Sequence, residues 1–135
     1  MLSIWKETSD IPPRNPLTGD LTAEAAVIGG GLCGILTAYL LWLRGVDTVV
    51  LEADRIGCGQ TGNTTAKITS QHGLIYHKLL EDFGVEKAWQ YASLNQKALE
   101  SYRKIIREKQ IDCDFKTEDA YLYSTLEIDS LLKEA

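Results

Sequence analysis

The sequence Glu24-Ala-Ala-Val-Ile-Gly-Gly-Gly-Leu-Cys-Gly34 decides how this chain folds, because it joins a short apolar run to a cluster of glycines. Gly29, Gly31 and Gly34 fit the pattern G-x-G-x-x-G. In a strand–turn–helix setting such glycines allow a tight turn, a close approach of a diphosphate to the backbone, and close packing of helix on strand. The free N–H groups and the positive dipole end of the helix would then hold the phosphates.

The residues on either side of the glycines strengthen this otherwise weak motif. Ala25–Ile28 predicts a strand, Leu32–Arg44 contains good helix formers, and Val46–Leu51 predicts a second strand. Glu52 follows the second strand and lies 23 residues after Gly29, close to the spacing of about 20 for the acid that binds a ribose hydroxyl. The sequence therefore predicts a dinucleotide-binding βαβ unit. An ordinary turn that uses glycine only for packing is the alternative.

Composition excludes several other classes of protein. Ala25–Leu43 lacks a charge and is long enough to suggest a membrane span, but three successive glycines interrupt it near its start. The 14 basic and 19 acidic residues form no basic stripe, so we expect no nucleic-acid partner. The three cysteines have no C-x-x-C spacing, which argues against a zinc site or a disulfide framework and favours a reducing cytoplasm.

A second informative stretch follows the acid directly. The loop Ala53–Lys67 holds three glycines and three threonines. Such a loop can bring backbone N–H and hydroxyl donors to a phosphate or a polar linker. A surface turn followed by a threonine-capped helix would have the same composition. The composition alone leaves both interpretations open.

Three segments together resemble a known family. They are Val27–Gly34, Val50–Gly57 and Gly59–Gly73. They are similar to the N-terminal part of FAD-dependent oxidoreductases of the D-amino-acid oxidase, glycine oxidase and sarcosine oxidase superfamily. The resemblance is greatest to bacterial members, some of which carry a C-terminal Rieske iron–sulfur domain. It extends from about Pro16 to the end of the chain, and it covers only the first part of a family member.

The resemblance implies which residues of the βαβ unit would bind FAD. The residues that would surround the FAD pyrophosphate are Gly29, Gly31, Leu32, Cys33 and Gly34. Glu52 would accept hydrogen bonds from the adenosine ribose hydroxyls. Ala53 and Arg55 would lie near the adenine end of the cofactor.

The resemblance also implies roles for the loop after the acid. The residues that would pass by the pyrophosphate and ribityl chain include Thr61, Gly62, Thr64 and Thr65. Ala66 and Lys67 would lead toward the flavin ring. Lys67 could place a cation near the flavin, and a solvated helix lysine is the alternative. Asn63 stands where some relatives carry a histidine bonded covalently to the flavin, so we expect FAD to be bound non-covalently.

The rest of the chain predicts helices and then strands. Amphipathic patterns at Leu74–Phe83 and Val85–Lys109 predict two helices. The apolar stripe of the longer one would serve core packing or, alternatively, a partner. Ile111–Thr125 predicts two short strands, which in the resembling family would begin the substrate domain. Leu126–Ala135 predicts a further helix. The two histidines, His72 and His77, do not have metal-ligand spacing, so we expect structural or surface roles for them and no metal site.

The predicted fold class is α/β: the N-terminal portion of a Rossmann-type FAD-binding domain with an incomplete sheet, followed by helices and the first short strands of a substrate domain. We expect Trp5 to pin the leader to the body of the protein. The predicted parts are an irregular leader at residues 1–22, the FAD-binding βαβ unit and Gly/Thr loop at 23–73, a helical segment at 74–110, and substrate-domain strands at 111–135.

By the resemblance, the parent enzyme would oxidise the C–N bond of an amine or amino acid, with hydride transferred to the flavin. Only two parallel strands can be found here, whereas a doubly wound sheet needs several. We therefore expect a fragment that is inactive by itself, with the catalytic residues elsewhere in the parent. Exposed sheet edges could support a homo-oligomer. A non-catalytic binding protein and a nicotinamide-binding Rossmann protein are the alternatives.

Overall fold

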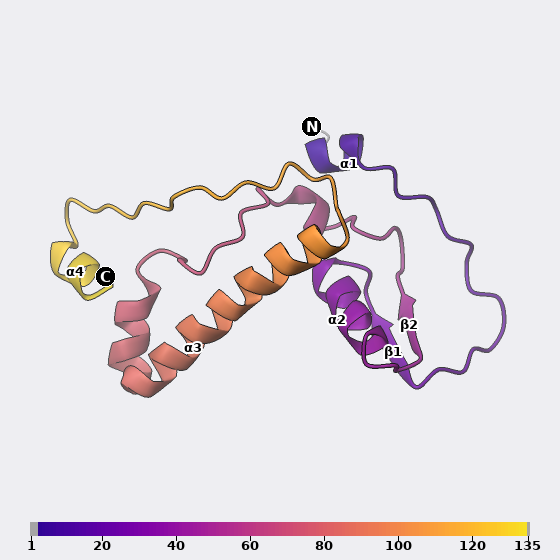
Figure 1. Cartoon of the computed structure of the whole chain (residues 1–135), viewed down its shortest axis with the longest axis horizontal. Helices are drawn as coiled ribbons and strands as arrows, with labels where there is room; N and C mark the ends of the chain where they lie inside the picture. Colours follow the sequence, from indigo (N-terminus) through magenta and orange to yellow (C-terminus); the bar gives the residue numbers. More distant parts are fainter. Residues whose placement is uncertain (1–2, 135) are drawn as a thin grey trace. The chain divides into compact units, whose positions relative to one another are not determined.

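The computed structural model describes residues 3–134, which divide into two compact units with the boundary between Ala66 and Lys67. Figure 1 shows the elements along the chain. In chain order they are α1 (Ile4–Thr8), β1 (Ala25–Ile28), α2 (Leu32–Trp42), β2 (Thr48–Leu51), the 3₁₀ helix η1 (Thr61–Asn63), α3 (Ile75–Glu108) and α4 (Ile128–Glu134).

The first unit contains a βαβ motif, with β1 and β2 paired in parallel and α2 connecting them. The register pairs Ala25 with Thr48 and Ile28 with Leu51. Beyond the strand ends, the N–H of Gly29 donates to the carbonyl of Leu51 at 2.7 Å. The partial Rossmann-type arrangement predicted from the glycine pattern is therefore confirmed.

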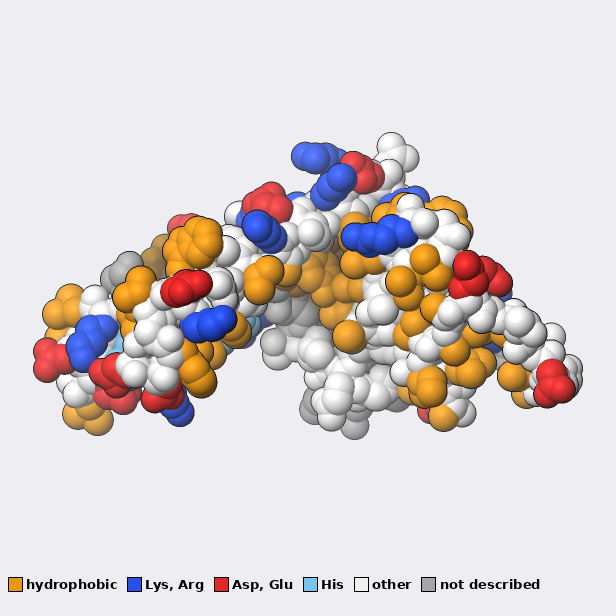
Figure 2. All heavy atoms as spheres, turned by 90° about the horizontal axis from the view of Figure 1, so that it is seen from below, with side chains coloured by type: hydrophobic (Ala, Val, Ile, Leu, Met, Phe, Trp, Pro, Cys, Tyr) orange, Lys and Arg blue, Asp and Glu red, His pale blue; other side chains and the backbone are white. Residues whose placement is uncertain are grey.

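One face of this small sheet is covered by α2 and the other is not. Val27 points toward the helix, since a Cβ at Gly34 would lie 3.4 Å from its Cγ1. Because side chains alternate along a strand, Ile28 points to the opposite face, where it is 87 % exposed. Among the hydrophobic residues that the structure describes, Ala88 alone is buried. Figure 2 accordingly shows many apolar side chains at the surface.

The leader differs from the irregular segment that we expected. Residues Ile4–Thr8 form the short helix α1, because a run without glycine or proline precedes the first proline at Pro12. Residues 9–24 have no helix or strand. No helix among residues 3–134 is long and apolar enough to cross a membrane.

The second unit is built on α3, which contains both predicted helices. Helical structure is continuous from Ile75 to Glu108 except at Gly84, whose φ of 79° and ψ of 171° are not helical, so α3 is kinked there. The kink separates a short arm before Gly84 from a long arm after it. Only glycine adopts this backbone conformation without strain, which explains why the break occurs at this residue.

The two short strands predicted in Ile111–Thr125 are not formed. This segment is extended and exposed for most of its length, with Tyr121 and Tyr123 more than four-fifths exposed. A strand needs a partner for its backbone hydrogen bonds, and β1 and β2, the strands of the described chain, pair with each other. The predicted helix after this segment is present as α4, while Ala135 lies outside the described residues.

A carboxylate from α4 satisfies the first turn of α3. The backbone N–H groups of Ile75, Tyr76 and His77 donate to the two oxygens of Glu134 at distances of 2.8 to 3.1 Å. Leu74, at the N-cap position of α3, offers no side-chain acceptor. A negative charge is favourable at the positive end of the helix dipole. Glu134 therefore supplies, from a distant part of the sequence, the cap that α3 lacks.

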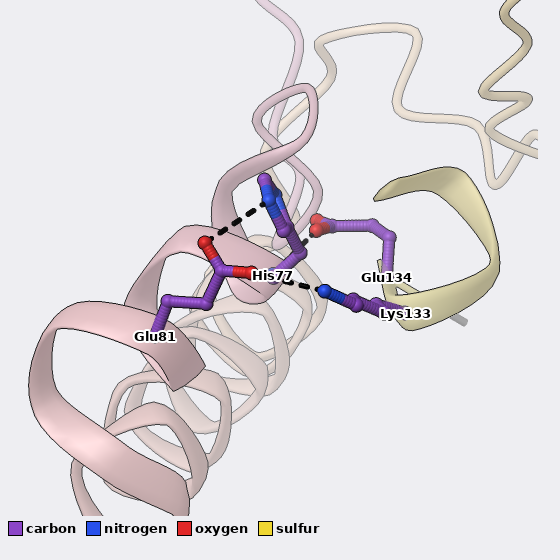
Figure 3. A network of polar contacts seen from close by, with 4 residues as sticks. All are labelled: His77, Glu81, Lys133 and Glu134. Carbon is purple, nitrogen blue, oxygen red and sulfur yellow. Dashed lines mark hydrogen bonds and ion pairs between the residues drawn. The ribbon is translucent and has the colours of Figure 1, made fainter. Parts of the chain in front are cut away.

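One charged contact joins α3 and α4, and a second lies beside it within α3 (Figure 3). Lys133 donates to Glu81 at 3.0 Å, and Nε2 of His77 lies 3.5 Å from the same carboxylate. The hydrogen bond from Lys133, its positive charge and that of a protonated His77 lower the pKa of Glu81. Both Lys133 and Glu81 are exposed to solvent, so their ion pair contributes less than the backbone cap made by Glu134.

We expect Glu134→Ala to destabilise the second unit by about 1 kcal/mol, because three backbone N–H groups lose their acceptor. Hydrogen exchange of the amides of residues 75–77 should become faster. Glu134→Gln keeps an oxygen acceptor without the charge and should have a smaller effect. Glu118→Ala, at an exposed site, is the control. Unchanged exchange in Glu134→Ala would show that the cap does not stabilise α3.

Candidate cofactor site

The turn between β1 and α2 depends on glycine at two positions. Gly29 has φ 102°, a backbone conformation that L side chains rarely adopt. A Cβ at Gly34 would overlap the carbonyl oxygen of Gly29. The first turn of α2 therefore lies directly against the end of β1, which brings its N–H groups to the carboxyl end of the sheet. Ligands of open α/β sheets bind at this end.

Glu52 points from the end of β2 to this turn. Its Oε2 accepts the backbone N–H of Gly30 at 2.6 Å, and its Oε1 accepts that of Asp54 at 3.0 Å. The hydrogen bonds from Asp54 and Gly30 lower the pKa of the Glu52 carboxyl, with a smaller contribution from the N–H of Ala53 and partial opposition from desolvation. The carboxylate is thus held ionised beside the glycine turn.

The loop after Glu52 supplies the cap of α2. Gly31 occupies the N-cap position and has no side chain to accept a hydrogen bond. Oγ1 of Thr61, at the start of η1, instead accepts the backbone N–H of Leu32 at 2.9 Å. The first turn of α2 contains no acidic residue. Its cap is therefore a neutral hydroxyl, and the negative charge beside this helix end is that of Glu52, which accepts the N–H of Gly30.

These groups enclose a cavity of about 230 Å³. Its lining residues are Gly31, Glu52, Cys58, Gly59, Gln60 and Thr61. The cavity offers a carboxylate acceptor, a hydroxyl and backbone groups at a helix N-terminus, which is the donor and acceptor set for a sugar and a phosphate. Its volume is below the range of about 300–1,000 Å³ for drug-sized ligands, so it has room for part of a dinucleotide.

A larger hollow, of about 510 Å³, lies elsewhere and does not belong to this site. Its lining consists of the five consecutive residues Leu126 to Ser130 in the second unit. A hollow made by one short segment has no converging groups from different elements, which binding sites ordinarily have.

Among residues 3–134, no group of three or more His, Cys, Asp or Glu side chains is arranged to hold a metal ion.

The structure brings some of the residues predicted to bind the cofactor together at the cavity and leaves others away from it. Gly31, Glu52 and Thr61 line the cavity, and Leu32 and Cys33 form the first turn of α2 beside it. The predicted residues outside the lining are Gly29, Gly34, Ala53, Arg55, Gly62, Thr64, Thr65 and Ala66. Lys67 belongs to the second unit. A contact of each with FAD stays a prediction.

Sequence reasoning missed four residues at this site. Gly30 is buried and donates to Glu52, while Cys58, Gly59 and Gln60 contribute to the lining. The pattern G-x-G-x-x-G treats the position of Gly30 as variable, so it gives no signal there. The other three lie in the Gly/Thr loop that composition had singled out, but only folding shows which of its residues turn toward α2.

A parallel βαβ unit with a glycine turn, a carboxylate at the end of its second strand and a cavity between them defines a Rossmann-type nucleotide-binding unit. Comparison with family models identifies it further. Residues 24–135 match the model described as FAD dependent oxidoreductase, DAO. Because the match covers most of the chain, the chain belongs to this family, and the cofactor of the family is FAD.

Curated relatives agree with this family. The chain is 42 % identical over 123 residues to the Rieske 2Fe-2S iron-sulfur protein YhfW of Bacillus subtilis, covering 91 % of this chain and 24 % of the relative. It is 32 % identical over 104 residues to the gamma-glutamylputrescine oxidoreductase of Escherichia coli, covering 77 % and 24 %. The chain thus spans about a quarter of the length of these relatives. No solved structure matches.

A more distant relative is a protein described as bifunctional. The chain is 31 % identical over 83 residues to the tRNA 5-methylaminomethyl-2-thiouridine biosynthesis bifunctional protein MnmC of Psychrobacter cryohalolentis. The matched part is 57 % of this chain and 12 % of the relative.

Stability of the first unit should depend on pH through Glu52. Because the pKa of Glu52 is lowered in the folded chain, the stabilisation by its ionised form is fully present above the ordinary value of 4.5. It is lost as the pH falls through the lowered pKa. When the pH is lowered from about 5 to about 3, the thermal midpoint should therefore decrease more in the unsubstituted chain than in Glu52→Gln. Equal losses in both proteins would contradict this role.

Proposed function

We propose that this chain forms the FAD-binding portion of an oxidoreductase that oxidises the C–N bond of an amine or amino acid. The observation that carries the proposal is the convergence of Glu52, the N-terminus of α2 and Thr61 on one cavity. These groups come from separate segments of the chain and meet at the carboxyl end of the two strands. A dinucleotide with a ribose and a diphosphate fits this set of donors and acceptors.

Glu52 would bind the adenosine ribose. Backbone N–H groups of Gly30 and Asp54 donate to the carboxylate, with a smaller contribution from Ala53, and an ionised carboxylate has about four lone-pair sites in total. Acceptor capacity therefore remains for ribose hydroxyl groups. The backbone hydrogen bonds orient the carboxylate in advance, so that binding of a sugar does not carry the cost of ordering it.

Thr61 and the first turn of α2 would bind the diphosphate. The Thr61 hydroxyl accepts the N–H of Leu32 and retains its own O–H as a donor. A phosphate oxygen could receive that O–H and share the N–H groups of the helix end. Because the cap is neutral, a phosphate meets no like charge from Thr61 at the positive end of α2.

The names of two relatives support the C–N part of the proposal. One contains gamma-glutamylputrescine, a derivative of a diamine, and the other a methylaminomethyl group. Both groups contain a carbon–nitrogen single bond. When bound, FAD supplies the acceptor for hydride from the carbon beside nitrogen, and the protein supplies binding, orientation and electrostatics.

The cofactor part is tested by titrating the purified chain with FAD and following the quenching of flavin fluorescence. We expect Gly31→Val to weaken FAD binding at least about tenfold, because a Cβ at Gly31 would already lie 3.2 Å from Oγ1 of Thr61 and the added methyl groups would fill the diphosphate site. Thr37→Val, at an exposed position of α2, is the matched control. Binding of NADH but not FAD by the parent chain would contradict the proposal.

The C–N part is tested in a chimera. This chain replaces the matching segment of the gamma-glutamylputrescine oxidoreductase, and the chimera is mixed without oxygen with an amine or with a 2-hydroxy acid. We expect bound flavin to be bleached by the amine and not by the hydroxy acid, which would show that this chain holds FAD in a position that suits C–N oxidation by the substrate-binding residues of the host. A chimera that retains FAD but is not reduced by any amine would contradict the C–N proposal while leaving FAD binding intact.

A further inference from the structure

The N-terminal segment lies against the loop that forms one wall of the cofactor cavity. The helix α1 packs on η1, and the indole Nε1 of Trp5 donates to the carbonyl oxygen of Thr64 at 2.8 Å. This hydrogen bond joins residues 59 positions apart in the sequence. We refer to residues 4–11 as the N-terminal strap.

The strap contacts the loop on both sides of the cavity lining. The stem of Lys6 covers the buried Gly62, where a Cβ would lie 2.8 Å from Cε of the lysine. At the other end, Nη2 of Arg55 donates to the carbonyl of Ile11 at 3.0 Å. The side chain of Ile11 lies near Gly57, 3.5 Å from the position of a Cβ there.

The contacted positions enclose the part of the loop that faces the cavity. The strap holds Arg55 and Gly57 before that part, and Gly62 and Thr64 after it. The residues between them include Cys58 to Thr61, which line the cavity. No strap residue lines the cavity itself. The strap also precedes the part of the chain that matches the family model, which begins at residue 24.

We infer that the N-terminal strap is a positioning element for the cofactor site: it fixes the loop of residues 57–64 and thereby sets the affinity for a dinucleotide. This inference rests on the proposed FAD site. A loop of glycines and threonines without the strap would have to be ordered by the ligand, at a cost in affinity. With the strap in place, the Thr61 hydroxyl is already held at the N-terminus of α2.

The test uses Trp5→Ala and Trp5→Phe in the full chain, with two measurements on each. Trp5→Ala removes the indole N–H and the whole ring system, while Trp5→Phe removes the N–H and part of the ring area but keeps an aromatic ring. We expect amide exchange in residues 57–64 to become faster and the Kd for FAD to rise about tenfold in Trp5→Ala, as for a lost hydrogen bond and its packing. Trp5→Phe should lie between Trp5→Ala and the parent chain.

Trp89→Phe is the matched control, because Trp89 is 69 % exposed on α3 and belongs to the other unit. It should leave both measurements unchanged. Far-ultraviolet circular dichroism should be the same in all variants, which separates a local loss of loop order from unfolding. Deletion of residues 1–11 provides a second perturbation and should match or exceed the effect of Trp5→Ala.

The failures of the two proposals can be told apart. If the parent chain binds FAD and the Trp5 variants bind it equally well, the strap does not position the site. If amide exchange in residues 57–64 is the same in the Trp5 variants as in the unsubstituted chain, the proposed role of the strap is also contradicted. If the parent chain does not bind FAD at all, the proposed function of the chain fails, and the role of the strap in cofactor binding fails with it.

Discussion

The N-terminus of α2 imposes the constraint on which the first unit depends. The first N–H groups of a helix have no partners within the helix and need acceptors from elsewhere. Here the close approach of α2 to β1 requires glycine, since a Cβ at Gly34 would overlap the backbone of Gly29, and Gly31 at the N-cap has no side chain to offer. The acceptors are therefore Glu52, for the turn, and Thr61, for the helix. The same contacts that complete the helix end build the wall of the cavity.

The second unit meets the same constraint in a chemically different way. Glu134 places a full negative charge on three N–H groups of α3, so this helix end is neutralised by the chain itself. At α2 the acceptor is a hydroxyl, and the first turn contains no acid. An anion would therefore meet a carboxylate directly on the first N–H groups of α3, whereas at α2 it would meet a neutral cap, with the charge of Glu52 beside it on Gly30. The difference between a carboxylate and a hydroxyl explains why one of two capped helices is the better candidate for a phosphate site.

Sequence could predict the features that are encoded locally. The glycine spacing and the apolar runs predicted both strands and α2, and the boundary between the two predicted amphipathic helices coincides with the kink at Gly84. The contacts that complete the site join distant residues: Thr61 is 29 positions from Leu32, and Trp5 is 59 from Thr64. No local pattern indicates such partners.

The prediction of strands near Tyr121 was wrong for a related reason. Aromatic and β-branched residues favour a strand only where another strand is present to pair with it.

The small amount of buried apolar surface makes these polar contacts more important than they would be in a larger domain. Ala88 is the single buried hydrophobic residue of the described chain, and Ile28 is almost fully exposed beside the glycine turn. A hydrogen bond contributes only about 1 kcal/mol net to stability. Because so little apolar surface is buried here, each of the hydrogen bonds made by Glu52, Thr61 and Trp5 is nevertheless a large part of the stability of the first unit. A ligand that binds only the folded chain stabilises it by about 2.7 kcal/mol at 100 times its Kd. Cofactor binding would therefore add about as much stability as two or three such hydrogen bonds, and a residue that orders the loop contributes to both.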